Sequence, residues 1–129
     1  MSKLIEAMKE KKNYHGLNGV SNQEIDLAQV KLGVSFSDDY KDYTASVGIA
    51  SFDGHELTGV CSSPRLDVVK ATEKCRKLIP GIKPTWYVLE ELNIDQITIW
   101  QDTDGAIYRV SPHAEPVKIA QGIGEYINI

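Results

Sequence analysis

Histidine and cysteine are the side chains in this chain best suited to bind a metal or attack a substrate. The sequence contains His15, His55 and His113, together with Cys61 and Cys75. A zinc site takes its ligands in closely spaced pairs from one turn or helix, and these five residues form no such pair. A Cys–His nucleophile needs surroundings that stabilise the thiolate, which nothing in the pattern indicates. Reduced, partly buried cysteines are the simpler interpretation.

Two aspartates followed by a glycine could also begin a calcium-binding loop. Asp102-x-Asp104-Gly105 resembles the start of such a loop, which has glycine at its sixth position and glutamate at its twelfth. Here glycine is fourth and His113 is twelfth. A hairpin turn accounts for the same residues, because Asp and Gly adopt the unusual dihedral angles that tight turns require.

Two further motifs give weak signals. His55-Glu56 has the residue types of an acid–base pair, but neighbouring strand residues point to opposite faces and do not share a substrate. One of the two side chains should point inward to order a bend, and the other should face solvent or a partner. Gly122-x-Gly124 lacks the third glycine and the preceding strand of a dinucleotide site. We therefore expect no catalytic centre, no metal and no cofactor, and predict that the protein is not an enzyme.

Capping residues predict the helices of the amino-terminal half. Ser21 followed by Glu24 forms a capping box, which predicts a helix from Asn22 to Leu32 that stops at a left-handed Gly33. A short amphipathic helix is expected before it, from about Lys3 to Lys11.

A second capped helix should follow at once. Ser37 is its expected N-cap, Asp38 and Asp39 suit the positive end of its dipole, and Gly48 should close it. Its buried face is predicted from residues at helical spacing: Phe36, Tyr40, Tyr43 and Val47.

Glycines and one more helix organise the middle of the chain. Residues 51–59 should be extended with tight bends, where the backbone passes close to another part of the molecule. A later helix should end at Pro80-Gly81, with an inward stripe at spacings of three and four made of Val68, Ala71, Cys75 and Leu78.

The carboxy-terminal half reads as strands because it is rich in β-branched and aromatic residues. Consecutive strands should pair antiparallel, with a hairpin turn at Asp102 to Gly105, and Trp100 should point away from Ile97 and Ile99. The predicted strands are 56–60, 86–89, 97–101, 106–110 and 117–119, before a weak final helix. The predicted fold class is α+β, an antiparallel sheet with helices packed against it.

Length and charge limit the possible functions. A chain of 129 residues forms one domain with enough apolar content for its own core. Residues 1–12 lack the apolar run of a signal peptide or membrane span, so we expect a cytoplasmic protein that does not bind membranes. The net charge is −4, which argues against direct binding of nucleic acid. Residues 13–69 and 84–129 each carry −5, whereas residues 70–83 carry +4, a distribution that suits a basic protein partner.

The order of these motifs resembles the SUKH superfamily. The likeness covers residues 21–129, and residues 1–20 are expected to supply a helix and connector in front of it. Its pieces are Ser21-x-x-Glu24-Ile25, Leu32-Gly33-Val34, Tyr40-x-x-Tyr43, Gly48, Phe52-x-Gly54-x-Glu56-Leu57-x-Gly59, Trp86-Tyr87-Val88, Ile97 to Trp100, Gln101-Asp102-x-Asp104-Gly105-x-x-Tyr108 and Ile119 to Ile129.

The resemblance implies a single SUKH-like domain that acts as an immunity protein. Such a protein neutralises a cognate bacterial toxin, commonly a nuclease, by stoichiometric binding. Two alternatives stay open: a regulatory interaction module without a toxin partner, and a small-ligand binder using residues 52–59. The sequence does not fix the oligomeric state. From charge and expected exposure, the predicted toxin contacts are Asp38, Asp39, Asp42, Asp53, Glu56, Asp102 and Asp104.

Overall fold

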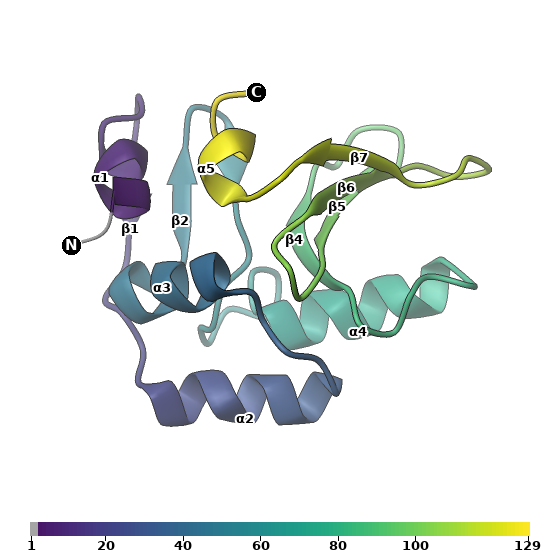
Figure 1. The fold of residues 1–129 in the computed structure, drawn as a ribbon, viewed down its shortest axis with the longest axis horizontal. Coiled ribbons are helices and arrows are strands. Elements are labelled where there is room, and N and C mark those ends of the chain that lie inside the picture. The colour runs from purple at the N-terminus through teal and green to yellow at the C-terminus, as the bar shows by residue number, and fades with distance from the viewer. Residues whose placement is uncertain (1–2) are drawn as a thin grey trace.

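The computed structural model describes residues 3–129, which form helices and two antiparallel sheets (Figure 1). The helices are α1 Lys3–Lys9, α2 Asn22–Leu32, α3 Asp38–Val47, α4 Val68–Leu78 and α5 Ile123–Tyr126. The strands are β1 His15–Gly16, β2 Ala50–Phe52, β3 His55–Glu56, β4 Tyr87–Glu91, β5 Thr98–Gln101, β6 Ile107–Val110 and β7 Val117–Ala120. One sheet has the order β1-β2-β3 and the other β4-β5-β6-β7. The α+β class is confirmed, with the strands divided between two sheets.

The capping signals place α2 as predicted. The Ser21 hydroxyl accepts a hydrogen bond from the Glu24 amide at 3.2 Å, and Gly33 ends the helix at a φ of 68°. The Gly33 amide donates to the carbonyls of Gln29 and Val30, which satisfies groups left open at the end of the helix. The Glu24 carboxylate accepts from the Ser21 hydroxyl at 3.2 Å.

The aromatic face of α3 lies in the larger core. Ser37 caps the helix by accepting from the Tyr40 amide. Tyr40 and Tyr43 are fully buried, and the Tyr40 ring packs against Phe36 and Tyr87 with centroids 4.8 and 4.9 Å apart. Such packing adds to the burial of apolar area, so the predicted stripe holds the helix against the sheets.

Residues 51–59 form a hairpin and then cross between the sheets. Asp53 and Gly54 have φ angles of 48° and 84°, which the tight turn between β2 and β3 requires. Only Glu56 of the predicted strand 56–60 lies in a strand, β3, because the chain leaves β2 after Leu57. Leu57 and Gly59 form isolated bridges with Glu90 and Asp67. The Thr58 amide donates to the Leu89 carbonyl at 2.8 Å, so this segment joins the two sheets.

Strand β5 separates two cores, as its alternation predicts. Ile99 belongs to the larger core and Trp100 to a smaller one between the sheet and α4. Trp100 is fully buried, and its indole N–H donates to the Thr98 hydroxyl at 2.8 Å. The sheet therefore has a hydrophobic layer on each face, with α4 running under it (Figure 1).

The predicted inward stripe of α4 is right for three residues and wrong for the fourth. Val68, Ala71 and Cys75 are buried, but Leu78 is 72% exposed. The last turn of α4 lies beside a groove instead of the sheet, and Leu78 lines that groove. The spacing of the stripe is therefore correct, but the sheet leaves its last residue, Leu78, uncovered.

Gly59 should tolerate no side chain. A Cβ at this position would lie 1.8 Å from the Gly48 carbonyl oxygen, so backbone would have to move. We expect Gly59→Ala to lower the free energy of unfolding by about 3 kcal/mol, measured by urea denaturation. Gly124→Ala is the control, because a Cβ there meets nothing within 4 Å and alanine favours the helix. Equal stability of the two variants would contradict this packing.

Alkaline pH should unfold the protein cooperatively. Burial raises the pKa of Tyr40, Tyr43, Tyr87 and Tyr126 well above the usual 10.0. The stabilisation is therefore complete below pH 10 and falls as the pH rises, because only the unfolded phenols release protons there. Four such groups remove about 5 kcal/mol per pH unit. Tyrosinate absorbance and far-UV circular dichroism should change together, and tyrosinate formation in a protein that keeps its helices would contradict the prediction.

Candidate protein-binding surfaces

The seven acidic residues predicted as contacts fall into two groups. The first lies at α3 and the turn between β5 and β6, and comprises Asp38, Asp39, Asp42, Asp102 and Asp104. The second, Asp53 and Glu56, belongs to the β2–β3 hairpin. The hairpin turn lies at the end of β2 remote from α3 (Figure 1), so the two groups occupy different parts of the surface.

Hydrogen bonds hold the start of α3 against the β5–β6 turn. The Thr103 hydroxyl donates to the Ser35 carbonyl at 2.9 Å. The buried Gln101 amide donates to the Asp39 carboxylate at 3.1 Å and to the Gly105 carbonyl at 3.0 Å. Its oxygen accepts from the Tyr87 hydroxyl at 2.8 Å. These bonds hold two segments that are distant in sequence next to each other.

Asp39 has an internal structural role. Its carboxylate accepts from the Ser37 hydroxyl, from the Gln101 amide, and from the Ile123 backbone N–H at 2.8 Å. Both oxygens are thus engaged with donors of the same chain. Asp39 fixes α3 to the sheet and to the start of α5.

Asp102 is likewise used to build its own turn. One oxygen accepts from the Asp104 and Ala106 amides, each at 3.0 Å, and the other accepts from the Tyr108 hydroxyl at 3.0 Å. Gly105 has a φ of 100°, which explains why glycine follows the two aspartates. The predicted hairpin turn is confirmed, and its first aspartate shapes the turn.

The remaining carboxylates of the first group are free. Asp38 and Asp104 are exposed and Asp42 is half-buried. Within residues 3–129, no hydrogen bond or ion pair engages these three side chains. Asp38 and Asp42 are four residues apart in α3 and therefore share one side of the helix. We call Asp38, Asp42 and Asp104 the acidic face.

The hairpin group carries less free charge. Arg65 binds Glu56 through its two terminal guanidinium nitrogens, at 2.8 and 3.0 Å, and this pairing lowers the pKa of Glu56. Asp53 is exposed in the turn. Because Arg65 balances Glu56, the hairpin group carries less uncompensated negative charge than the acidic face.

Glu90 is a central residue that sequence reasoning missed. It is 2% exposed, and its carboxylate contacts His55 Nδ1 at 2.9 Å, the Glu56 amide at 2.8 Å and the Tyr126 hydroxyl at 2.5 Å. His55 thus points inward and Glu56 outward, as their alternation predicts. The available signal was an acidic residue directly after the apolar residues of β4. Glu90 ties β3, β4 and α5 together.

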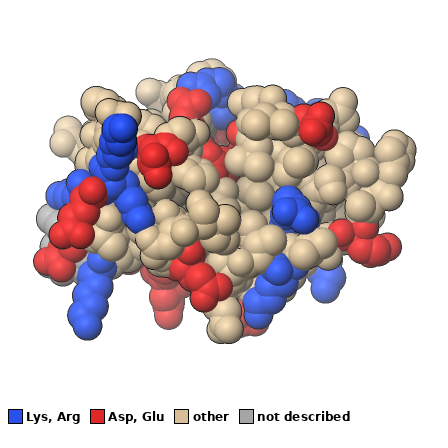
Figure 2. Space-filling view, turned by 90° about the horizontal axis from the view of Figure 1, so that it is seen from above, with Lys and Arg blue, Asp and Glu red and all other residues tan. Residues whose placement is uncertain are grey.

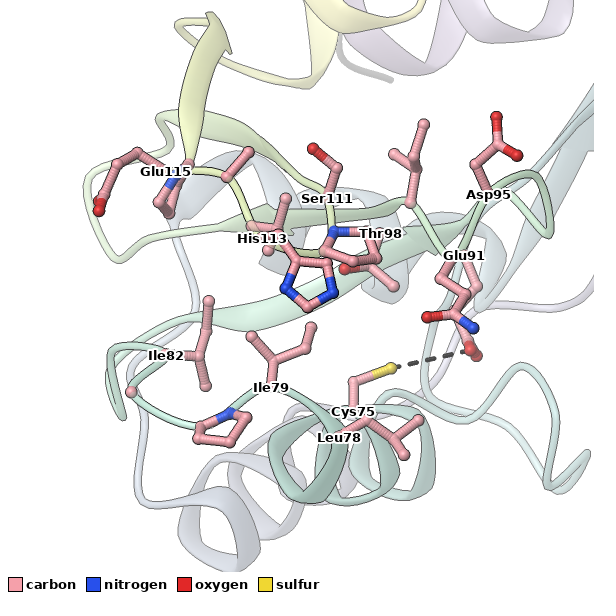
Figure 3. A pocket seen from close by; sticks show the side chains of 18 of the residues that line it. Cys75, Leu78, Ile79, Ile82, Glu91, Asp95, Thr98, Ser111, His113 and Glu115 are labelled. Atoms are coloured by element: carbon pink, nitrogen blue, oxygen red, sulfur yellow. Dashed lines mark hydrogen bonds between the residues drawn. The ribbon is translucent and has the colours of Figure 1, made fainter.

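A groove of about 1160 Å³ lies between the end of α4, the β4–β5 loop and the β6–β7 loop (Figure 3). Cys75 lies at its base, with its sulfur 3.7 Å from a Glu91 oxygen. Burial, with a smaller effect of Glu91, raises the pKa of Cys75 to about 11. The thiol is therefore protonated at neutral pH and poorly suited to nucleophilic attack. Residues 52–59, considered above for a small ligand, do not line this groove.

Residues 3–129 contain neither a cluster of metal-binding side chains nor a membrane-spanning helix. In that part of the chain no three His, Cys, Asp or Glu side chains gather in a way that would hold a metal ion. None of its helices combines the length and apolar character needed to cross a bilayer.

On the face seen from above, acidic and basic side chains are interspersed (Figure 2), so charge on this face is mixed in sign.

Sequence comparison now places the protein in a family. The family described as SUKH_5, SMI1-KNR4 cell-wall, matches residues 1–128. Because the match spans nearly the whole chain, the protein belongs to the SUKH (SMI1-KNR4) family, which confirms the resemblance inferred from the motifs. A comparison with curated proteins finds no match.

Two neighbouring aspartates should differ sharply in their effect on stability. Asp39→Asn leaves one of its donors facing an amide nitrogen, so we expect a loss of about 2 kcal/mol in the free energy of unfolding. Asp38→Asn, in the same first turn, should cost less than about 0.5 kcal/mol, because it loses only a helix-dipole interaction. Urea denaturation measures both, and similar losses would contradict the internal role of Asp39.

Proposed function

We propose that this protein is an immunity protein that binds and neutralises a cognate bacterial toxin. The observation that carries the proposal is family membership over residues 1–128. SUKH proteins are generally immunity or binding proteins and not enzymes. The structure adds a physical reason. Two side chains that could do acid–base or nucleophilic chemistry, Cys75 and Glu90, are buried and engaged inside the molecule.

The acidic face is the proposed contact with the toxin. Its three carboxylates have no partner within residues 3–129, and the segments that carry them are joined by the bonds of Gln101 and Thr103. A fixed arrangement of charges reduces the entropy lost on binding. Asp53 and Glu56 form a weaker candidate surface, because Glu56 is paired with Arg65.

A nuclease is the toxin class that best suits this surface. Nucleases that contact phosphate present lysine and arginine side chains. An acidic face can compete for that surface, and complementary charge raises the association rate. Asp39 and Asp102 would act indirectly, by holding the contact residues in place.

Complex formation with the protein encoded beside this gene tests the proposal. We expect co-expression to protect cells from that protein and the purified pair to form a stoichiometric complex. Replacing Asp38, Asp42 and Asp104 together by lysine should slow association about tenfold at low salt, and added salt should reduce the difference. The control replaces Glu6, Glu10 and Glu73 by lysine, which changes the net charge equally at other exposed positions.

Three outcomes separate the possibilities. Neither protection nor a complex would refute the immunity function. A complex whose association rate is the same for the acidic-face variant and the control would remove the acidic face from the interface. A stable complex with a neighbour that has no toxic activity would instead support a regulatory interaction module.

A further inference from the structure

The groove beside α4 is apolar in its middle and acidic at its two ends. Leu78 and the following Ile79 and Ile82 line one side, and Ile97, just before β5, and Val110 of β6 also belong to the lining. Asp95 in the β4–β5 loop and Glu115 in the β6–β7 loop lie at opposite ends of the lining (Figure 3). The β5–β6 turn, which belongs to the acidic face, lies at the other end of this antiparallel sheet. The groove is therefore a separate surface.

One large apolar side chain of the lining is left uncovered. Leu78 continues the buried stripe of α4 but is 72% exposed, and it lines the groove. The other members of that stripe, from Val68 to Cys75, are covered by the sheet. Contiguous apolar surface bordered by polar residues is typical of interaction sites.

The loops on either side of the groove hold strained backbone. Asn93, Asp95 and Gln96 have φ angles of 59°, 52° and 60°, and His113 in the opposite loop has a φ of 62°. Non-glycine residues adopt this conformation at a cost of about 1–2 kcal/mol each, less for Asn and Asp. Such strain concentrates at functional sites, and it adds an independent observation to the uncovered apolar surface.

The charged residues that line the groove indicate which kind of partner segment would fit it. Glu91 is neutralised by Lys74, whose nitrogen lies 2.8 Å from its oxygen. Within residues 3–129, no hydrogen bond or ion pair engages the carboxylates of Asp95 and Glu115. The uncovered charge is therefore negative at both ends of an apolar surface.

We propose that this groove binds a segment of a partner protein whose apolar side chains are flanked on both sides by lysine or arginine. The apolar side chains would cover Leu78 and Ile97, and the flanking cations would meet Asp95 and Glu115. The inference rests on the proposed function only in taking the partner to be a protein. It adds a second contact, at the end of the sheet opposite the acidic face.

Two synthetic peptides and the isotopically labelled protein test the inference. Both peptides have a central Leu-Leu-Trp-Leu core, flanked on each side by a pair of lysines in one and a pair of glutamates in the other. We expect the lysine peptide to shift amide resonances of groove residues such as Leu78, Ile97 and Ala114. It should bind at least about tenfold more tightly than the glutamate peptide at low salt.

A charge variant makes the test specific. Asp95→Asn with Glu115→Lys should abolish the preference for the lysine peptide, and asparagine keeps the left-handed backbone accessible. Glu10→Gln with Glu73→Lys changes the net charge equally outside the groove and should keep the preference. Absent binding, shifts outside the groove, equal affinity for both peptides, or an unchanged preference in the groove variant would each overturn the inference. So would dimerisation of the free protein through the groove.

These results are independent of the test of toxin binding. If the unaltered protein shows no preference for the lysine peptide but still forms the toxin complex, only the groove proposal is refuted. Peptide binding in the groove without a toxin complex would refute only the immunity function.

Discussion

The arrangement of the surface depends on the hydrogen bonds that the Asp39 carboxylate accepts. It accepts from the buried Gln101 amide and from the Ile123 N–H, so one side chain joins α3, β5 and the start of α5. Without this acceptor, donors with little access to water would lose their partner, which costs more than the bond itself contributes. The positions of Asp38 and Asp104 relative to each other follow from this contact.

The acidic residues therefore perform two different tasks. Asp39, Asp102 and Glu90 act inside the molecule as acceptors for backbone and side-chain donors. Asp38 and Asp104 remain free at the surface. The internal carboxylates fix the segments that carry the exposed carboxylates. Such an arrangement would suit a binding protein.

The two candidate surfaces use different physical forces. The acidic face offers exposed charge, which chiefly affects the rate and selectivity of association. The groove offers apolar area, which contributes to affinity when it is removed from water. They lie at opposite ends of the four-stranded sheet, so a single partner would have to span the sheet to engage both.

The sequence by itself determined the local structure. The caps at Ser21 and Ser37, the hairpin turn at Asp102 and the alternation of Ile99 with Trp100 all depend on neighbouring residues, and the structure has each where predicted. Only the tertiary structure decided which acidic residues turn inward and where the sheet leaves Leu78 uncovered. These features depend on contacts between segments distant along the chain, and neither residue type nor spacing records which donors a carboxylate will meet.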